Sequence, residues 1–144
     1  MPSAGDIIRA EDVQLDAWPS YTPTISGWTL GNGTLAGYAL QAGKDIRFRI
    51  EYTVGSTDTK SGTLAFALPV AARWAATPLT ALPPVGQAAL RDVSAPAGRA
   101  RSVILLTSST CQIVDEAFSA VTHTVPWTWA TGDLIVVNGS YEAA

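Results

Sequence analysis

The side chains that most often do chemistry in proteins are scarce in this chain of 144 residues. His123 is its single histidine and Cys111 its single cysteine. A structural zinc site takes about four ligands, mostly of these two types, so the composition argues against a bound metal. A Ser-His-Asp triad would have to use His123, but the sequence holds no G-x-S-x-G elbow. We therefore expect His123 to be a surface or interface residue.

Carboxylates offer a second kind of chemistry, because glycoside hydrolysis needs two of them about 5–10 Å apart. The twelve acidic residues are scattered along the chain. The adjacent Asp115 and Glu116 would point to opposite faces of a strand, so they would not form such a pair. We expect no enzymatic activity and no cofactor.

A glycine-rich stretch at residues 31–37 has the spacing G-x-G-x-x-x-G. A dinucleotide-binding loop requires G-x-G-x-x-G followed by a helix, whereas a strand pattern follows here. A phosphate-binding P-loop is also excluded, because Gly43-Lys44 precedes Asp45 and not Ser or Thr. These glycines are better explained as turns, with Gly43 supplying a positive φ in a hairpin.

Tryptophan is abundant, with five residues in the chain. Trp127 and Trp129 would share one face of an extended segment, and a flat aromatic pair of this kind could stack on a sugar ring. Tryptophans also fill cores and subunit interfaces, where their large apolar area and single N–H donor suit half-wet settings. Trp74, Trp127 and Trp129 are therefore candidate ligand-binding or interface aromatics, and both interpretations stay open.

Basic residues could form a patch if Arg47 and Arg49 lay beside Arg99 and Arg101. Acidic residues alternate with the first pair, so a solvated face or an ion-pair belt is the simpler expectation. The net charge of −3 argues against a nucleic-acid partner. No stretch approaches the roughly 18 consecutive apolar residues of a membrane span.

The elements that would carry these residues are strands. Residues 45–54 alternate strictly between apolar and polar side chains, as in a strand that is buried on one side. Similar short segments separated by turn signals follow to the end of the chain. We expect an all-β fold, a single antiparallel β-sandwich of jelly-roll type with about eight strands. Its predicted core contains Ile46, Phe48, Ile50, Leu64, Phe66 and Leu68.

This domain should span residues 19–144, preceded by an extended N-terminal arm over residues 1–18. We expect the arm to dock on a neighbouring subunit or on a larger particle. Its candidate docking residues are Ile7, Ile8, Val13, Leu15 and Trp18. The chain is 47% hydrophobic and only 15% charged, so we expect it to hide surface against copies of itself.

The first half of the chain also carries a recognisable string of residues. Its shared features are Trp18, Tyr21-Thr22-Pro23-Thr24, Gly31-Asn32-Gly33-Thr34-Leu35, Gly37-Tyr38, Gly43 and the closing segment from Gly62 to Pro69. This string resembles a segment of structural proteins from tailed bacteriophages and prophages, especially those of actinobacteria. Such proteins include minor tail proteins, fibre or knob modules and virion surface proteins.

The resemblance implies a virion structural role, a β-sandwich and often a trimer. We accordingly expect a capsid decoration or accessory protein on the particle surface, made in the host cytoplasm. Its partners would be copies of itself, as a homotrimer, and virion proteins such as the major capsid protein. The alternative is a tail or head-fibre knob, a minor tail protein that recognises a host surface glycan through Trp127 and Trp129.

Overall fold

A computed structural model of the chain describes residues 18–73 and 83–144. Regular structure in these residues is entirely β, and no helix able to cross a membrane occurs among them. The strands are β1 (Ser20–Tyr21), β2 (Ile25–Thr29), β3 (Thr34–Ala42), β4 (Asp45–Thr53), β5 (Thr59–Ala67), β6 (Pro84–Asp92), β7 (Ala97–Leu105), β8 (Thr110–Val114) and β9 (Leu134–Glu142).

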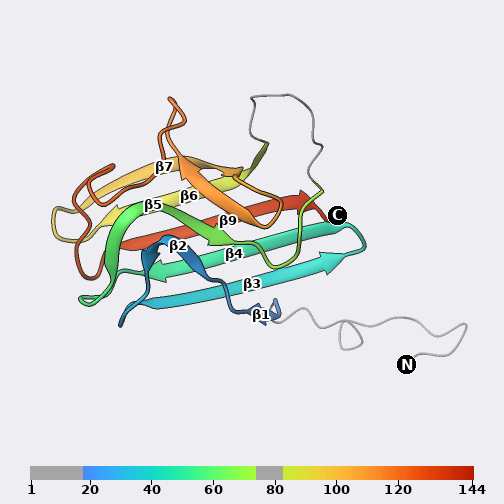
Figure 1. Cartoon of the computed structure of the whole chain (residues 1–144), viewed down its shortest axis with the longest axis horizontal. Helices are drawn as coiled ribbons and strands as arrows, with labels where there is room; N and C mark the ends of the chain where they lie inside the picture. Colours follow the sequence, from blue (N-terminus) through green and yellow to red (C-terminus); the bar gives the residue numbers. More distant parts are fainter. Residues whose placement is uncertain (1–17, 74–82) are drawn as a thin grey trace, which may run out of the picture.

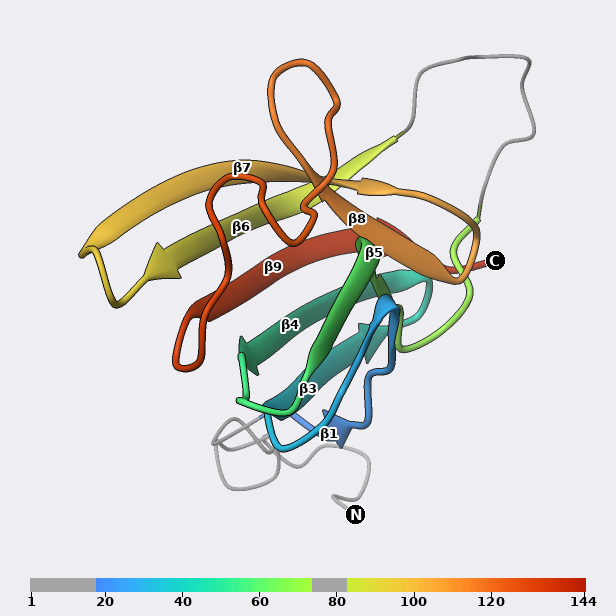
Figure 2. The same cartoon turned by 60° about the vertical axis from the view of Figure 1, so that its left-hand side comes forward.

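All nine described strands belong to one antiparallel sheet, in the order β1-β3-β4-β9-β6-β7-β8-β5-β2. β1 and β2 lie at opposite edges of the sheet, although only residues 22–24 separate them in the chain. The sheet must therefore curl until its edges approach each other, and β5 and β2 lie across β3 and β4 in Figure 2. The Tyr21 hydroxyl donates to the Ala67 carbonyl oxygen across the gap, at 3.2 Å.

This architecture confirms the expected all-β, antiparallel, sandwich-like fold. Its two layers are parts of a single curled sheet that forms a half-barrel (Figure 1). Residues 45–53 form the predicted strand that is buried on one side, because Ile46, Phe48 and Ile50 are buried while their neighbours face outward. Leu64, Phe66 and Leu68 are buried opposite them, so the predicted core is also confirmed.

One side of the half-barrel is closed by a loop segment instead of a strand. β8 is short and pairs only with residues 102–105 of β7 and 65–67 of β5. Beyond β8 these two neighbours diverge, as Figure 2 shows. Val121 and Trp129, in the segment between β8 and β9, complete the core there. The Leu64 amide donates to the Val121 carbonyl oxygen at 3.0 Å and fixes this segment to β5.

Candidate interaction surface

The glycine-rich loop between β2 and β3 cradles a carboxylate that belongs to the chain itself. Asp58 Oδ1 accepts the amides of Gly31 and Gly33, at 2.6 and 3.0 Å. Asp58 Oδ2 accepts the Gly55 amide at 2.8 Å and the Tyr52 hydroxyl at 2.5 Å. The glycines let the backbone approach this carboxylate closely, since a Cβ on Gly33 would lie 2.2 Å from Asp58 Oδ2. The loop is therefore a structural anchor whose anion is already in place.

The protonation states in this anchor follow from its hydrogen bonds. Burial raises the pKa of Asp58, but the Tyr52 hydroxyl and the three amides outweigh burial and hold that pKa below its usual value. Burial, together with the hydrogen bond to Asp58, raises the pKa of Tyr52 above its ordinary range. At neutral pH an ionised carboxylate thus faces a neutral phenol, which is the pairing with the strongest hydrogen bonds.

The tryptophan pair does not form a flat exposed platform. Trp129 is only 3% exposed, and its Nε1 donates to the Val125 carbonyl oxygen at 3.1 Å. Its ring meets Trp28 edge-on, with 5.8 Å between the ring centroids. Trp127 is half-buried and tilted by 49° against Trp129, and its Nε1 is shielded from solvent without an acceptor. These two rings therefore build the closed side of the half-barrel.

The candidate docking residues of the arm fall largely outside the described part of the chain. This applies to Ile7, Ile8, Val13 and Leu15, and also to the candidate aromatic Trp74. Trp18 is described: it is half-buried and borders a shallow hollow of about 460 Å³, together with Arg47, Gln87, Asn138 and Ser140. The arm thus joins the domain beside this hollow.

The four arginines do not share a patch, because β9 and β6 separate β4 from β7. Arg47 and Arg49 lie on the outer face and pair with Asp45 and Glu51, at 3.6 and 3.3 Å. Arg49 also stacks over Tyr38, 4.7 Å from the ring centroid. This part of the outer face is the solvated ion-pair surface that the sequence suggested.

A second hollow, of about 510 Å³, lies on the outer face of β6, β7 and β9. Its lining includes Gln87, Ala89, Ala100, Ser102, Asp115, Glu116, Val136 and Asn138. Gln87 and Asn138 also border the hollow at Trp18, so the two hollows are neighbours on the outer face. The surface is shallow, with a floor of small side chains and a rim of amide, hydroxyl and carboxylate groups.

Beside this hollow, the loop after β8 presents an aromatic side chain to solvent. Phe118 is 63% exposed, the largest value among the exposed apolar residues of the described chain, and has a φ of 60°. Asp115 fixes the loop, because its Oδ1 accepts the amides of Ala117 and Ser119 at 2.8 and 2.9 Å. The Phe118 amide also donates to the Asp115 carbonyl oxygen at 3.0 Å. A non-glycine residue held in this left-handed conformation is uncommon and is often found at functional sites.

Sequence reasoning did not select Phe118. The available signal was an aromatic residue inside Asp-Glu-Ala-Phe-Ser, where an aspartate can bind the amides two and four residues later. That signal predicts a turn, but it does not reveal that the turn projects away from the core.

The β6–β7 hairpin supplies a third exposed feature, which is a strand edge. Residues 97–101 of β7 pair with β6 on one side, and in the described chain they have no strand on the other side. Figures 1 and 2 show the hairpin extending past the end of β8. Arg99 and Arg101 lie on this edge, and their Nη1 atoms donate to the carbonyl oxygens of Gly98 and Ala100, at 2.8 and 3.2 Å.

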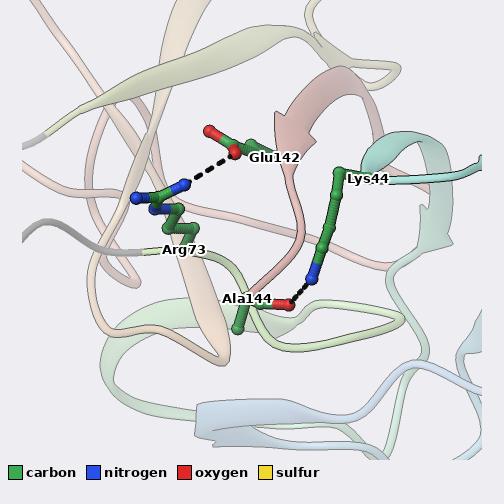
Figure 3. A network of polar contacts seen from close by, with 4 residues as sticks. All are labelled: Lys44, Arg73, Glu142 and Ala144. Carbon is green, nitrogen blue, oxygen red and sulfur yellow. Dashed lines mark hydrogen bonds and ion pairs between the residues drawn. The ribbon is translucent and has the colours of Figure 1, made fainter.

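The opposite end of the sheet is closed by contacts within the chain (Figure 3). Lys44 Nζ donates to the Ala144 carbonyl oxygen at 2.5 Å, and Arg73 pairs with Glu142 at 3.2 Å. Ala72 and Ala143 form a β-bridge between these two contacts.

Comparisons of the chain with protein-family models, with curated proteins and with solved structures find no match. The exposed features described above and the resemblance in residues 18–70 are therefore the guides to function.

Proposed function

We propose that the chain is a non-enzymatic structural protein of a tailed-bacteriophage particle, and specifically a decoration protein bound to the capsid surface. The resemblance of residues 18–70 to phage structural proteins supports a role in the phage particle. The exposed features of the structure support a protein that acts by contact.

Phe118 is the observation that carries this proposal. Burying an exposed phenylalanine contributes about 1.5–3 kcal/mol, and aromatic residues are enriched at the centre of protein interfaces. A flexible loop would lose entropy when such a residue docks, whereas the Asp115 turn already fixes this one. The loop therefore presents a preorganised apolar anchor, which suits attachment to a repeated protein surface.

A second function, host-glycan recognition by a fibre or tail knob, is favoured by a different observation. The outer hollow is rimmed by Gln87, Ser102, Asn138 and the carboxylates of Asp115 and Glu116. Amides, hydroxyls and carboxylates are the groups that hydrogen-bond sugar hydroxyls. This proposal predicts binding at the hollow and no dependence on Phe118 for assembly.

Particles that lack the protein, with purified protein added back, distinguish these proposals. Electron microscopy of reconstituted particles should show many symmetric copies on the icosahedral shell. Phe118→Ser should abolish this density while the protein remains folded. Leu106→Ser is the matched control, because Leu106 is also an exposed apolar residue, in the turn after β7, and should leave binding unchanged.

A few copies confined to the tail would overturn the decoration proposal. Loss of host adsorption in Gln87→Ala/Asn138→Ala, with normal particle assembly, would establish the glycan-binding alternative.

A further inference from the structure

The free edge of β7 is rich in hydrogen-bond donors. The backbone direction along β7 follows from two hydrogen bonds near its end. The Leu105 amide donates to the Pro83 carbonyl oxygen on the β6 side, and the Leu106 amide donates to the Thr110 carbonyl oxygen of β8, both at 2.9 Å. Directions alternate along a strand, so the carbonyl groups of Gly98 and Ala100 point away from β6. In an antiparallel ladder, the N–H and C=O of one residue point to the same side. The amides of Gly98 and Ala100 therefore also face outward, beside the guanidinium groups of Arg99 and Arg101.

This edge selects an acidic extended segment. Two copies of β7 would not pair with each other readily, because their arginines would lie close together and like charges repel. An extended acidic segment would instead place its backbone carbonyl oxygens opposite the amides and its carboxylates opposite the guanidinium groups.

The chain itself contains a segment with these properties. Residues 12–16 read Asp-Val-Gln-Leu-Asp, so acidic or amide side chains alternate with apolar ones. Residues 1–17 contain four acidic residues and one basic residue. If Asp12 and Asp16 face the arginines, Val13 and Leu15 face the side of Ala100, which borders the outer hollow.

The segment of the same copy is too close to its own β1 to reach this edge. The side chain of Trp18 borders the hollow, but the backbone beside it lies at the β3 edge, because the Pro19 carbonyl oxygen accepts the Ala39 amide at 2.9 Å. Asp16 is two residues from Trp18, which allows a reach of about 7 Å. β7 is separated from β1 by four strands, or five inter-strand spacings of about 4.8 Å, which amount to roughly 24 Å along the sheet. Figures 1 and 2 place β1 and β7 on opposite sides of the domain.

We propose that residues 12–16 of a second copy bind as an added strand along residues 97–101 of β7. Each copy donates one segment and accepts another. Two copies that exchange segments with each other form a closed dimer, and copies that each donate to the next form a ring. This inference goes beyond the proposed function, because the exchange needs only this chain and no particle.

Charge reversal in the full-length chain tests the exchange. Sedimentation velocity should show that Arg99→Glu/Arg101→Glu weakens self-association about tenfold, as expected for two exposed ion pairs. Asp12→Lys/Asp16→Lys should weaken it equally, and the four changes together should restore it. Arg49→Glu/Arg73→Glu is the matched control, with the same change in charge at two arginines outside the β6–β7 hairpin, and should have no effect on self-association. A monomeric wild type at about 100 μM, or additive losses in the fourfold variant, would overturn the proposal.

Amide exchange measured by NMR identifies the edge independently. The Gly98 and Ala100 amides should exchange at least tenfold more slowly in the wild type than in Asp12→Lys/Asp16→Lys. Equal exchange rates would exclude β7 as the acceptor. Particle binding by the Asp12→Lys/Asp16→Lys variant is measured separately, so failure of the exchange and failure of the decoration proposal are distinguishable.

Discussion

Replacing Asp58 should have the largest effect of any single polar substitution in the described chain. Its carboxylate accepts four hydrogen bonds, and the side chain is only 7% exposed. A hydrogen bond to a charged group contributes about 1.5–3 kcal/mol, and each orphaned buried donor costs about 1–3 kcal/mol. We expect Asp58→Asn to lower the free energy of unfolding by about 3 kcal/mol, because its amide cannot accept from both Gly55 and Tyr52. Asp58→Ala should lower it by about 5 kcal/mol.

Urea denaturation followed by tryptophan fluorescence at pH 7 measures these losses. Tyr52→Phe removes one of the four bonds and should cost about 1–2 kcal/mol. Asp45→Asn is the surface control, because Asp45 is exposed and its contact with Arg47 is long, at 3.6 Å. Its effect should stay below about 0.5 kcal/mol. A loss under about 1 kcal/mol in Asp58→Asn would refute the view that this carboxylate anchors the loop.

The pH dependence has a definite sign. The pKa of Asp58 is lower in the folded chain than in the unfolded chain, where it is about 3.9. The contribution of Asp58 is therefore fully present above about pH 5 and is lost as the pH falls through the folded pKa. The difference in unfolding free energy between wild type and Asp58→Asn should shrink steadily below pH 4. A difference that stays constant from pH 7 to pH 2 would contradict the assigned hydrogen bonds.

Three further experiments test the rest of the fold. Phe48→Asp should prevent folding, because Phe48 is 0% exposed and a carboxylate there has no partner; a folded circular dichroism spectrum would contradict this. Trp129→Ala should lower the free energy of unfolding by about 3–5 kcal/mol in urea denaturation. Trp127→Ala should lower it clearly less, since Trp129 is buried and Trp127 is half-buried. Equal losses would contradict the placement of these two rings. Burial raises the pKa of Cys111 to about 12 and raises the pKa of Tyr21, so their contributions are lost as the pH rises above their unfolded values near 8.5 and 10. Urea midpoints should fall between pH 9 and 11, and a flat profile would exclude this.

The local structure of the sheet could be predicted because it depends on neighbouring residues. Alternation at residues 45–54 determines which side chains are buried, and Gly43 provides the positive φ of 61° in the β3–β4 hairpin that precedes them. The strand order could not be predicted in the same way. No local pattern indicates that β1 and β2 lie at opposite edges, because that arrangement depends on pairings between distant segments.

The exposed features were harder to predict than the core. Trp127 and Trp129 were expected to share one face of an extended segment, whereas their rings are tilted by 49° and only Trp129 is buried. Sequence could not assign them to core or surface, since that depends on the gap left by the short β8. The partner of the glycine-rich loop was missed for a similar reason, because Asp58 lies 25 residues or more from Gly31 and Gly33. The free edge of β7 follows from the unequal lengths of β7 and β8, and sequence defines strand ends poorly.

The arginines of β7 have two roles in the proposed exchange, and both depend on the same geometry. Their guanidinium groups bind the outward carbonyl oxygens of Gly98 and Ala100, which protects an open edge from pairing with its own kind. An incoming acidic segment offers better acceptors for the guanidinium groups and frees those carbonyl groups for a strand ladder. The edge is thus closed to a second β7 and open to an acidic strand. Arg99→Ala/Arg101→Ala should therefore weaken the specific association and also promote non-specific aggregation, which light scattering would detect as growing particle size. Unchanged solubility in this variant would show that the arginines do not protect the edge and serve only to bind the acidic segment.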